Sequence, residues 1–245
     1  EHLIFDAEIF KDMVKQTSFA ASVDESKGVL VGVLTEIHPQ SVSMVALDGY
    51  RLAVSTEKMN SGQENHFIIS AKIINEISKI IAEDGDAEEV EIYLGKKKAT
   101  FRIDTTEIVL RLMEGEYIKY RDIMPTQSTT DIVIGRAILQ ESIERASLLA
   151  REGKNNLIKM TIKNNLLTIT SRSEEGNVKE EIIMEKEGED LEIGFNSKFV
   201  IDVLKVIDDD EISMHFLTGT SPCMVKPVSG DAYEYLILPV RIPTM

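Results

Sequence analysis

Apolar residues recur at helical spacing in two pairs of matching stretches. Residues 70–81 (SAKIINEISKII) and 196–207 (NSKFVIDVLKVI) form one pair, and residues 6–22 and 135–151 form the other. Spacings of three and four positions place the apolar side chains on one face of a helix. Asp6 is suited to cap the earliest of these helices. Two similar helices in the same order in each half predict an internal duplication, with chance similarity as the alternative.

Between the expected helices lie short runs that are typical of strands. In the first half they cover residues 29–37, 42–47, 51–55, 90–94, 99–103 and 108–113, and in the second half residues 157–162, 166–171, 178–184, 212–217, 223–226 and 235–240. Asp48-Gly49 is a strong turn signal between two of these strands. The order predicts an α+β fold of two similar domains, each with two helices packed on one face of antiparallel sheets.

The length of 245 residues suits two domains of ordinary size. Residues 114–125 (EGEYIKYRDIMP) lack periodicity and are expected to connect the halves. We therefore place the domains at residues 1–119 and 120–245. Because the chain starts at Glu1 rather than Met, it is expected to be a fragment or a processed product.

Composition favours a protein of the cytoplasm. No apolar run is long enough to cross a membrane, and no membrane partner is expected. The single cysteine, Cys223, is expected to be a buried thiol, which fits a reducing compartment.

Charge is distributed unevenly along the chain. The net charge is −15, which argues against nucleic acid at first, yet the four expected helices together carry a small net positive charge. Lys72 and Lys79, and likewise Lys198 and Lys205, are seven residues apart, so each pair lies on one helical face. These faces could lie loosely against a polyanion. The alternative is that the lysines are only solvated.

We find no pattern that predicts catalysis, a metal or a cofactor. The four histidines are scattered without metal-ligand spacing. A hydrolase or metal enzyme on this scaffold would need a convergent set of titratable residues, and none stands at a recognisable spacing. The chain is therefore not expected to be an enzyme.

Exposed apolar residues near a strand edge offer a different kind of site. Residues 50–54 (YRLAV) follow the expected turn, and residues 235–240 include Pro239, which cannot donate a ladder hydrogen bond. A sheet edge with such neighbours is suited to binding an extended peptide.

Five stretches together resemble one family. They are LDGYRLAV (47–54), ISAKIINEISKI (69–80), ERASLLAREGKNN (144–156), IGFNSKFVIDVLKVID (193–208) and YLILPVRI (235–242). In this order they resemble the bacterial DNA polymerase III β subunit, the sliding clamp. The resemblance covers the family's second and third domains, so the first domain is expected to be absent here.

The resemblance implies a processivity factor whose helices line a hole around duplex DNA, held topologically and without sequence specificity. DNA polymerases, the clamp loader and repair proteins would dock through short linear motifs. The implied peptide-binding pocket comprises Leu30, Leu47, Gly49, Tyr50, Arg51, Leu52, Ile118, Ile123, Thr220, Pro222, Leu236, Leu238, Pro239, Val240 and Arg241. Ile118 stands where the family usually has a proline.

The family also implies an oligomeric state and the DNA-facing residues. Two subunits close a ring head to tail, the third domain meeting the partner's first, and Leu148 and Leu149 match apolar residues at that contact. Without the first domain, the fragment is expected to be monomeric. Lys72 matches a DNA-facing lysine, whereas Lys79, Lys198 and Lys205 are included on spacing alone. A duplicated adaptor without a DNA role remains the alternative function.

Overall fold

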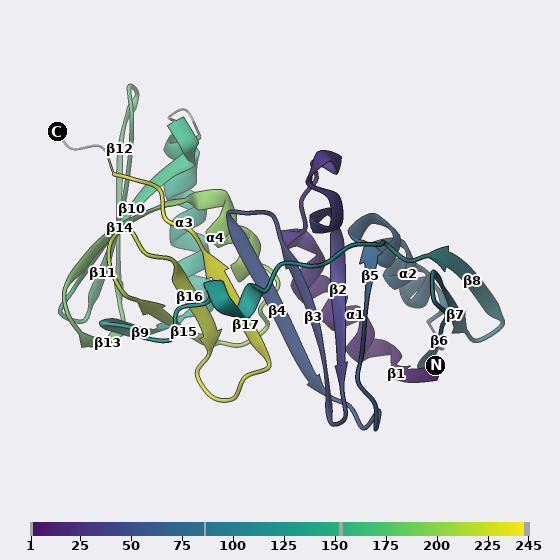
Figure 1. Cartoon of the computed structure of the whole chain (residues 1–245). Helices are drawn as coiled ribbons and strands as arrows, with labels where there is room; N and C mark the ends of the chain where they lie inside the picture. The colour runs from purple at the N-terminus through teal and green to yellow at the C-terminus, as the bar shows by residue number, and fades with distance from the viewer. Residues whose placement is uncertain (1, 86, 152–153, 243–245) are drawn as a thin grey trace. The chain divides into compact units, whose positions relative to one another are not determined.

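The chain folds into two compact units, residues 1–119 and 120–245. The computed structural model describes residues 2–85, 87–151 and 154–242 (Figure 1). Each unit has its own helices, sheets and core, and the two are described separately below.

The first unit contains two helices and two antiparallel sheets of four strands. Its elements are β1 (His2–Asp6), α1 (Ala7–Thr17), β2 (Gly32–His38), β3 (Ser41–Leu47), β4 (Arg51–Lys58), β5 (Asn65–Ser70), α2 (Ala71–Asp84), β6 (Glu89–Leu94), β7 (Lys98–Ile103) and β8 (Thr106–Arg111). Short 3₁₀ helices, η1 (Ser18–Ala20) and η2 (Glu25–Val31), follow α1. The strand orders are β1-β6-β7-β8 and β4-β3-β2-β5.

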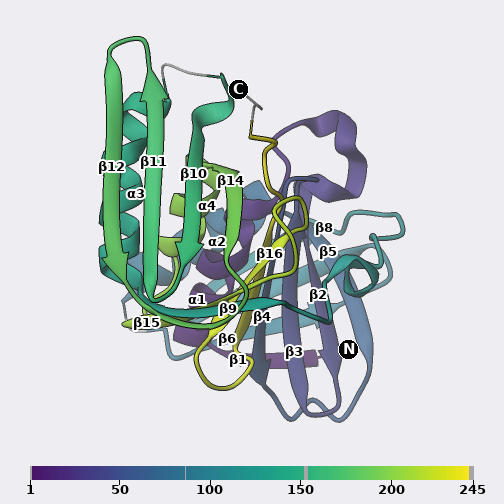
Figure 2. The ribbon, with the colours of Figure 1, turned by 90° about the vertical axis from the view of Figure 1, so that its left-hand side faces the viewer.

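The second unit repeats this plan. Its elements are η3 (Tyr120–Ile123), β9 (Thr130–Gly135), α3 (Arg136–Ala150), η4 (Lys154–Asn156), β10 (Leu157–Lys163), β11 (Leu166–Ser173), β12 (Gly176–Ile183), β13 (Glu185–Gly188), β14 (Leu191–Asn196), α4 (Ser197–Leu204), β15 (Glu211–Phe216), β16 (Cys223–Pro227) and β17 (Tyr233–Ile237). Its sheets run β12-β11-β10-β14 and β13-β9-β15-β16-β17. Figure 2 shows the first of these sheets face-on, with α3 packed behind β11 and β12.

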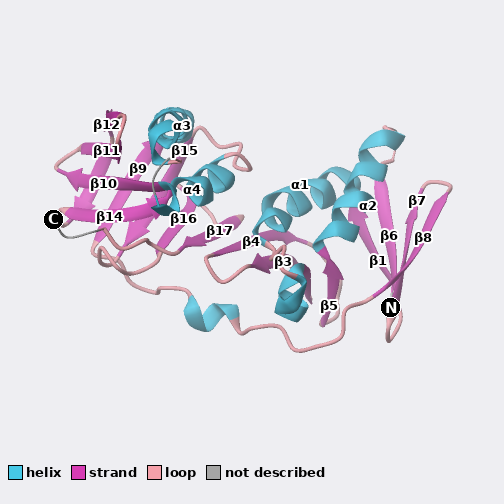
Figure 3. Cartoon of the chain, turned by 90° about the horizontal axis from the view of Figure 1, so that it is seen from above, coloured by secondary structure: helices cyan, strands magenta, loops and turns pink. Residues whose placement is uncertain are grey.

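The topology confirms the predicted α+β fold and the duplication. The order β1-β6-β7-β8 corresponds to β9-β15-β16-β17, and β4-β3-β2-β5 corresponds to β12-β11-β10-β14. Strand β13 is an addition at the edge beyond β9. In each unit the two helices lie together over one face of the strands (Figure 3).

The helices begin where the sequence predicts. Asp6 caps α1, because its Oδ1 accepts hydrogen bonds from the backbone N–H groups of Glu8 (2.9 Å) and Ile9 (3.0 Å). The apolar face of α1 buries Phe10 and Met13, each 1% exposed. The Phe10 ring also meets Phe101 of β7 edge-on at 6.0 Å. These contacts tie α1 to the sheet beneath it.

Several predicted boundaries were wrong, each for a local reason. The strand expected at 29–37 begins only at Gly32, because Gly28 takes a positive φ of 59° and residues 25–31 form 3₁₀ turns instead. The first helix ends at Thr17 and continues as η1. The strands expected at 108–113 and 235–240 end at Arg111 and Ile237, the latter two residues before Pro239. Strands β1, β5, β9, β13 and β14 were not predicted.

Within the described ranges, no helix is long and apolar enough to cross a membrane.

Candidate functional site

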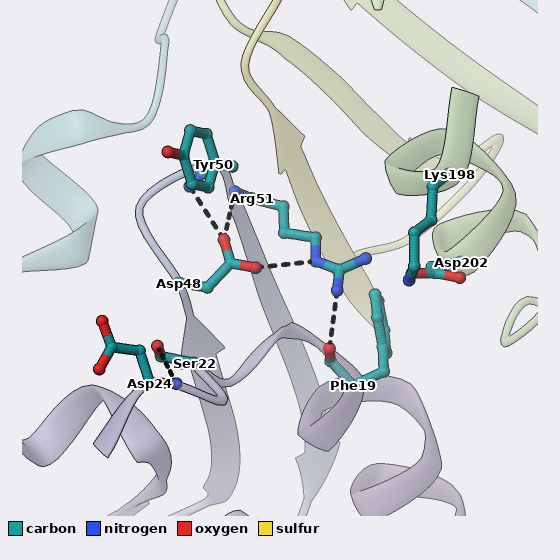
Figure 4. Close-up of polar contacts among 8 residues, drawn as sticks. All are labelled: Phe19, Ser22, Asp24, Asp48, Tyr50, Arg51, Lys198 and Asp202. Carbon is teal, nitrogen blue, oxygen red and sulfur yellow. Dashed lines mark hydrogen bonds and ion pairs between the residues drawn. The ribbon is translucent and has the colours of Figure 1, made fainter. Parts of the chain in front are cut away.

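The turn between β3 and β4 is organised by one carboxylate. Asp48 Oδ1 accepts hydrogen bonds from the backbone N–H groups of Tyr50 (2.9 Å) and Arg51 (3.1 Å), as Figure 4 shows. Gly49 takes a φ of 94°, a left-handed value that costs glycine little. The predicted turn is therefore present, and Asp48 fixes its backbone.

The same carboxylate holds the Arg51 side chain. Arg51 Nε donates to Asp48 Oδ2 at 3.2 Å, and its terminal nitrogen donates to the Phe19 carbonyl oxygen at 3.1 Å. The guanidinium also lies over the Phe19 ring, 5.3 Å from its centre. Arg51 is 9% exposed, so these contacts hold a largely buried charge in one position.

The apolar residues of this hairpin divide into a buried and an exposed group. Leu47 and Leu52 face each other across the two strands and are 3% and 1% exposed. Tyr50 at the tip is 61% exposed, and Leu30, in η2, is half-buried. Of the residues expected to contact a peptide from this hairpin, Tyr50 presents the most surface.

Ile118 lies near the end of the first unit, beside a residue that holds the chain against the sheet. The Tyr117 hydroxyl approaches the carbonyl oxygens of Gly32 (3.4 Å) and Val45 (3.5 Å). Burial raises the pKa of the Tyr117 phenol, so it stays a neutral hydrogen-bond donor. Ile118 itself is 43% exposed.

In the second unit, one ion pair attaches η3 to β17, and a second joins β17 to β16. Arg121 lies 2.8 Å from Glu234, which also pairs with Lys226 at 2.9 Å. Burial opposes the charge on Glu234, but Lys226 and Arg121 outweigh it and lower the pKa of this carboxyl. Ile123, at the end of η3, is held on this base with 49% of its surface exposed.

The segment after β17 crosses to the other sheet of the second unit. Leu236 is buried, Leu238, Pro239 and Val240 are half-buried, and Arg241 is exposed. The Val240 N–H donates to the Gly194 carbonyl oxygen of β14 at 2.8 Å. A Cβ on Gly194 would lie 2.6 Å from the Val240 carbonyl oxygen, so this close approach requires glycine.

Pro222 borders a small cavity of about 170 Å³ in the second unit. Residues 125–128, Leu217 and Met224 form other parts of its wall. Thr220 lies nearby in sequence on an exposed turn, where its N–H donates to Thr218 Oγ1 at 3.2 Å. The structure thus places the expected pocket residues in two groups, one in each unit.

Most lysines expected to face DNA have acidic neighbours. Lys79 pairs with Glu76 at 2.7 Å, Lys198 with Asp202 at 2.7 Å, and Lys205 approaches Glu144 at 3.8 Å. Lys72 is exposed, and in the described ranges it forms no ion pair. The spacings of Glu76 with Lys79 and of Lys198 with Asp202 are readable from sequence and could have predicted those pairs.

The expected subunit contact lies on α3, which packs against β11 and β12. Leu148 is 63% exposed and Leu149 is half-buried, so only Leu148 presents most of its side chain. Ile183, at the end of β12, is 85% exposed and was not predicted as a surface residue.

Three side chains, Ser213, His215 and Asp131, are connected by hydrogen bonds in the order of a catalytic triad. Ser213 Oγ lies 3.1 Å from His215 Nε2, and His215 Nδ1 lies 2.7 Å from Asp131 Oδ1. The serine hydroxyl is also 3.2 Å from the carbonyl oxygens of Lys226 and Pro227, and Ser213 is only 8% exposed. We interpret these three residues as a structural network, because the Ser213 hydroxyl donates its hydrogen to backbone carbonyl oxygens.

The single cysteine and the possible metal ligands are further candidates for chemistry. Cys223 is fully buried, and burial raises the pKa of its thiol, which disfavours the nucleophilic thiolate. Among the residues that the structure describes, no group of three or more His, Cys, Asp or Glu side chains is placed to hold a metal ion.

Comparison with known proteins matches both units. Residues 5–119 match the central domain of the DNA polymerase III beta subunit, and residues 121–241 match its C-terminal domain. The beta sliding clamp of Staphylococcus epidermidis is 37% identical over 236 residues, covering 95% of this chain and 62% of the relative. That of Staphylococcus aureus is 35% identical with the same coverage. The chain thus spans about three-fifths of the length of these curated relatives.

Solved structures agree with these matches. The DNA polymerase III beta subunit of Thermotoga maritima superposes with a TM-score of 0.93 at 32% identity, covering 99% of this chain and 66% of the other. The sliding clamp of Bacillus subtilis gives 0.94 at 31% identity, covering 99% and 65%. With two domain families matching in order across nearly all residues, the chain belongs to the DNA polymerase III β subunit family, the bacterial sliding clamps.

Proposed function

We propose that the chain contributes to a sliding clamp that encircles duplex DNA without sequence specificity and docks DNA polymerases, the clamp loader and repair proteins in the cytoplasm. The observation that carries this proposal is the match of both domain families, in order, across nearly the whole chain. In this role the chain binds and tethers, and it catalyses no reaction.

We place the docking function at the two groups of pocket residues. Support comes from exposed apolar side chains next to fixed polar ones: Tyr50 beside Arg51, and Ile123 beside Arg121. Large exposed side chains on a rigid base favour peptide binding, because little ordering entropy is lost when the peptide arrives.

Replacing Tyr50 or Leu238 with Ala is expected to weaken binding of a clamp-motif peptide by about fivefold or more, which corresponds to about 1 kcal/mol. The reason is that each side chain presents apolar surface outside the core, so its loss removes contact area with little effect on folding. The measurement is a fluorescence anisotropy titration of a labelled peptide against the 245-residue chain.

Val109→Ala is the matched control, because Val109 is 60% exposed on β8 and belongs to neither group of pocket residues. Peptide affinity unchanged in both Tyr50→Ala and Leu238→Ala would refute the proposed docking site.

We further propose that the 245-residue polypeptide does not close a ring alone. The resemblance implies a contact between the third domain and the partner's first domain, and the matches here cover the central and C-terminal domains. Sedimentation at micromolar concentration is expected to show one species near the chain mass of 27.4 kDa. A stable closed dimer would contradict this proposal.

A duplicated adaptor without a DNA role is the second candidate. The observation in its favour is that Lys79 and Lys198 already pair with carboxylates. Clamp and adaptor differ in whether the chain binds duplex DNA with an affinity that falls as salt rises.

A further inference from the structure

A cavity of about 460 Å³ lies beside the edge strand β5 in the first unit (Figure 1). Residues 65–68 of β5 form one wall, and residues 94–96 and 112–115 form the others. Met113 contributes a half-buried apolar side chain, and Lys96 is exposed. None of the lining residues belongs to the two docking groups or is expected to face DNA. A volume of this size with mixed apolar and polar walls is typical of ligand-binding cavities.

The outward edge of β5 is only partly covered by the chain. The Met113 N–H donates to the Ile68 carbonyl oxygen at 2.9 Å, on the side away from β2. Because alternate residues of a strand direct their N–H and C=O groups to the same side, those of His66 also point away from β2. The His66 N–H donates to the Asn65 side chain at 2.7 Å, an exposed local contact. The strand therefore presents the backbone of His66 at the cavity, and such an edge can pair with another chain.

The internal duplication provides a reference for this edge. The second unit has the same arrangement at β14, where the Val240 N–H donates to the Gly194 carbonyl oxygen at 2.8 Å. Gly194 and Ile68 stand at the same position, each two residues before the end of its strand. The two units can therefore be compared residue by residue along β5 and β14.

The edge of β14 is covered by a turn that is shorter in the first unit. Glu192 is the counterpart of His66, and a Cβ on Gly219 would lie 2.4 Å from the Glu192 carbonyl oxygen. Gly219 belongs to the turn of residues 217–222 between β15 and β16, whereas residues 95–97 form the corresponding turn between β6 and β7. The first unit therefore lacks the residues that would cover its edge strand, and the cavity takes their place.

Positive charge is concentrated next to the cavity. Lys96, Lys97 and Lys98 are consecutive and exposed. Lys98 stands opposite Arg111 in the β7-β8 ladder, and like charges in such pairs repel each other. Lys97 pairs at 2.9 Å with Glu114, the one carboxylate among the lining residues. In the part of the chain that the structure describes, the other three cations form no ion pair, so an acidic ligand is favoured here.

We propose that this cavity binds an extended, acidic peptide segment of a partner protein. The segment pairs with the backbone of His66, places an apolar side chain against Met113, and directs a carboxylate toward Lys96. Strand pairing and an apolar wall select a peptide over other polyanions. The site is separate from the docking groups around Tyr50 and Leu238, and it does not depend on the proposed clamp function.

The probe for this site is a fluorescein-labelled short peptide of alternating Val and Glu, because the period of a strand places all its carboxylates on one side. The same peptide with Lys in place of Glu is the charge control. In anisotropy titrations against the 245-residue chain, we expect saturable binding of the Val-Glu peptide only. Its affinity should fall as salt rises, because the lysines beside the cavity are exposed.

His66→Pro should abolish this binding, because proline removes the outward N–H while β5 keeps its ladder with β2. Lys96→Ala should weaken it several-fold. Lys58→Ala is the matched control for the lost charge, because Lys58 is exposed at the end of β4 in the same unit and does not line the cavity. The clamp-motif peptide should bind His66→Pro with wild-type affinity, which would show that the variant is folded and that the two sites are separate.

Equal binding of the two peptides, or no saturable binding to wild type, would overturn the proposal and leave the clamp function untouched. Wild-type affinity in both His66→Pro and Lys96→Ala would overturn it as well, since the peptide would then bind elsewhere. If sedimentation shows that wild type self-associates and that His66→Pro is monomeric, a second copy of the chain occupies the edge of β5 and the partner peptide is refuted.

Discussion

Leu52→Ala is expected to lower the free energy of unfolding of the first unit by about 2–5 kcal/mol. Leu52 is 1% exposed and stands opposite Leu47 in the β3-β4 ladder, so truncation leaves a cavity that the rigid hairpin does not fill. This is a large fraction of the stability of an ordinary domain.

Denaturant titration followed by amide hydrogen exchange would check this expectation, because exchange in β3 and β4 reports on the first unit separately. Val109→Ala again serves as control, and its effect should stay within about 0.5 kcal/mol. If Leu52→Ala weakens peptide binding but leaves the free energy of unfolding unchanged, Leu52 contributes to the peptide contact rather than to the stability of the core.

Asp48→Ala should destabilise the first unit by about 2–4 kcal/mol, the second largest effect that we expect. The substitution removes the acceptor for two backbone N–H groups and the partner of a guanidinium that is 9% exposed. Peptide affinity should fall as well, because Tyr50 and Arg51 lose the group that holds their backbone in place.

Asp48→Asn is a useful companion variant. The amide oxygen can still accept from the Tyr50 and Arg51 N–H groups, but the negative charge beside Arg51 is lost. In thermal unfolding, the melting temperature of Asp48→Asn should therefore lie between those of wild type and Asp48→Ala. Equal losses for Asn and Ala would show that the charge alone matters, and no loss for either would contradict the role that we assign to Asp48.

The helices could be predicted because their apolar positions repeat with a helical period. Strands β5 and β14 could not be predicted, because each has three consecutive buried residues and no alternation between apolar and polar positions. Such runs are ambiguous in sequence. The structure resolves them by burying both faces of each strand.

The candidate sites were predictable only in part. Asp48-Gly49 identified the turn, but the bond from Arg51 to the Phe19 carbonyl joins residues that are 32 positions apart and depends on the tertiary fold. The ion pair between Arg121 and Glu234 was missed for the same reason, since these residues are 113 positions apart. Short-range patterns carry no information about either contact.

Gly194 has a consequence that extends beyond its own strand. A side chain at position 194 would displace Val240. The path of the C-terminal segment therefore depends on a residue more than 40 positions earlier in the sequence. In a set of related sequences, loss of glycine at position 194 should coincide with changes at positions 238–241. An engineer who transplants this C-terminal segment onto another scaffold would have to bring the glycine with it.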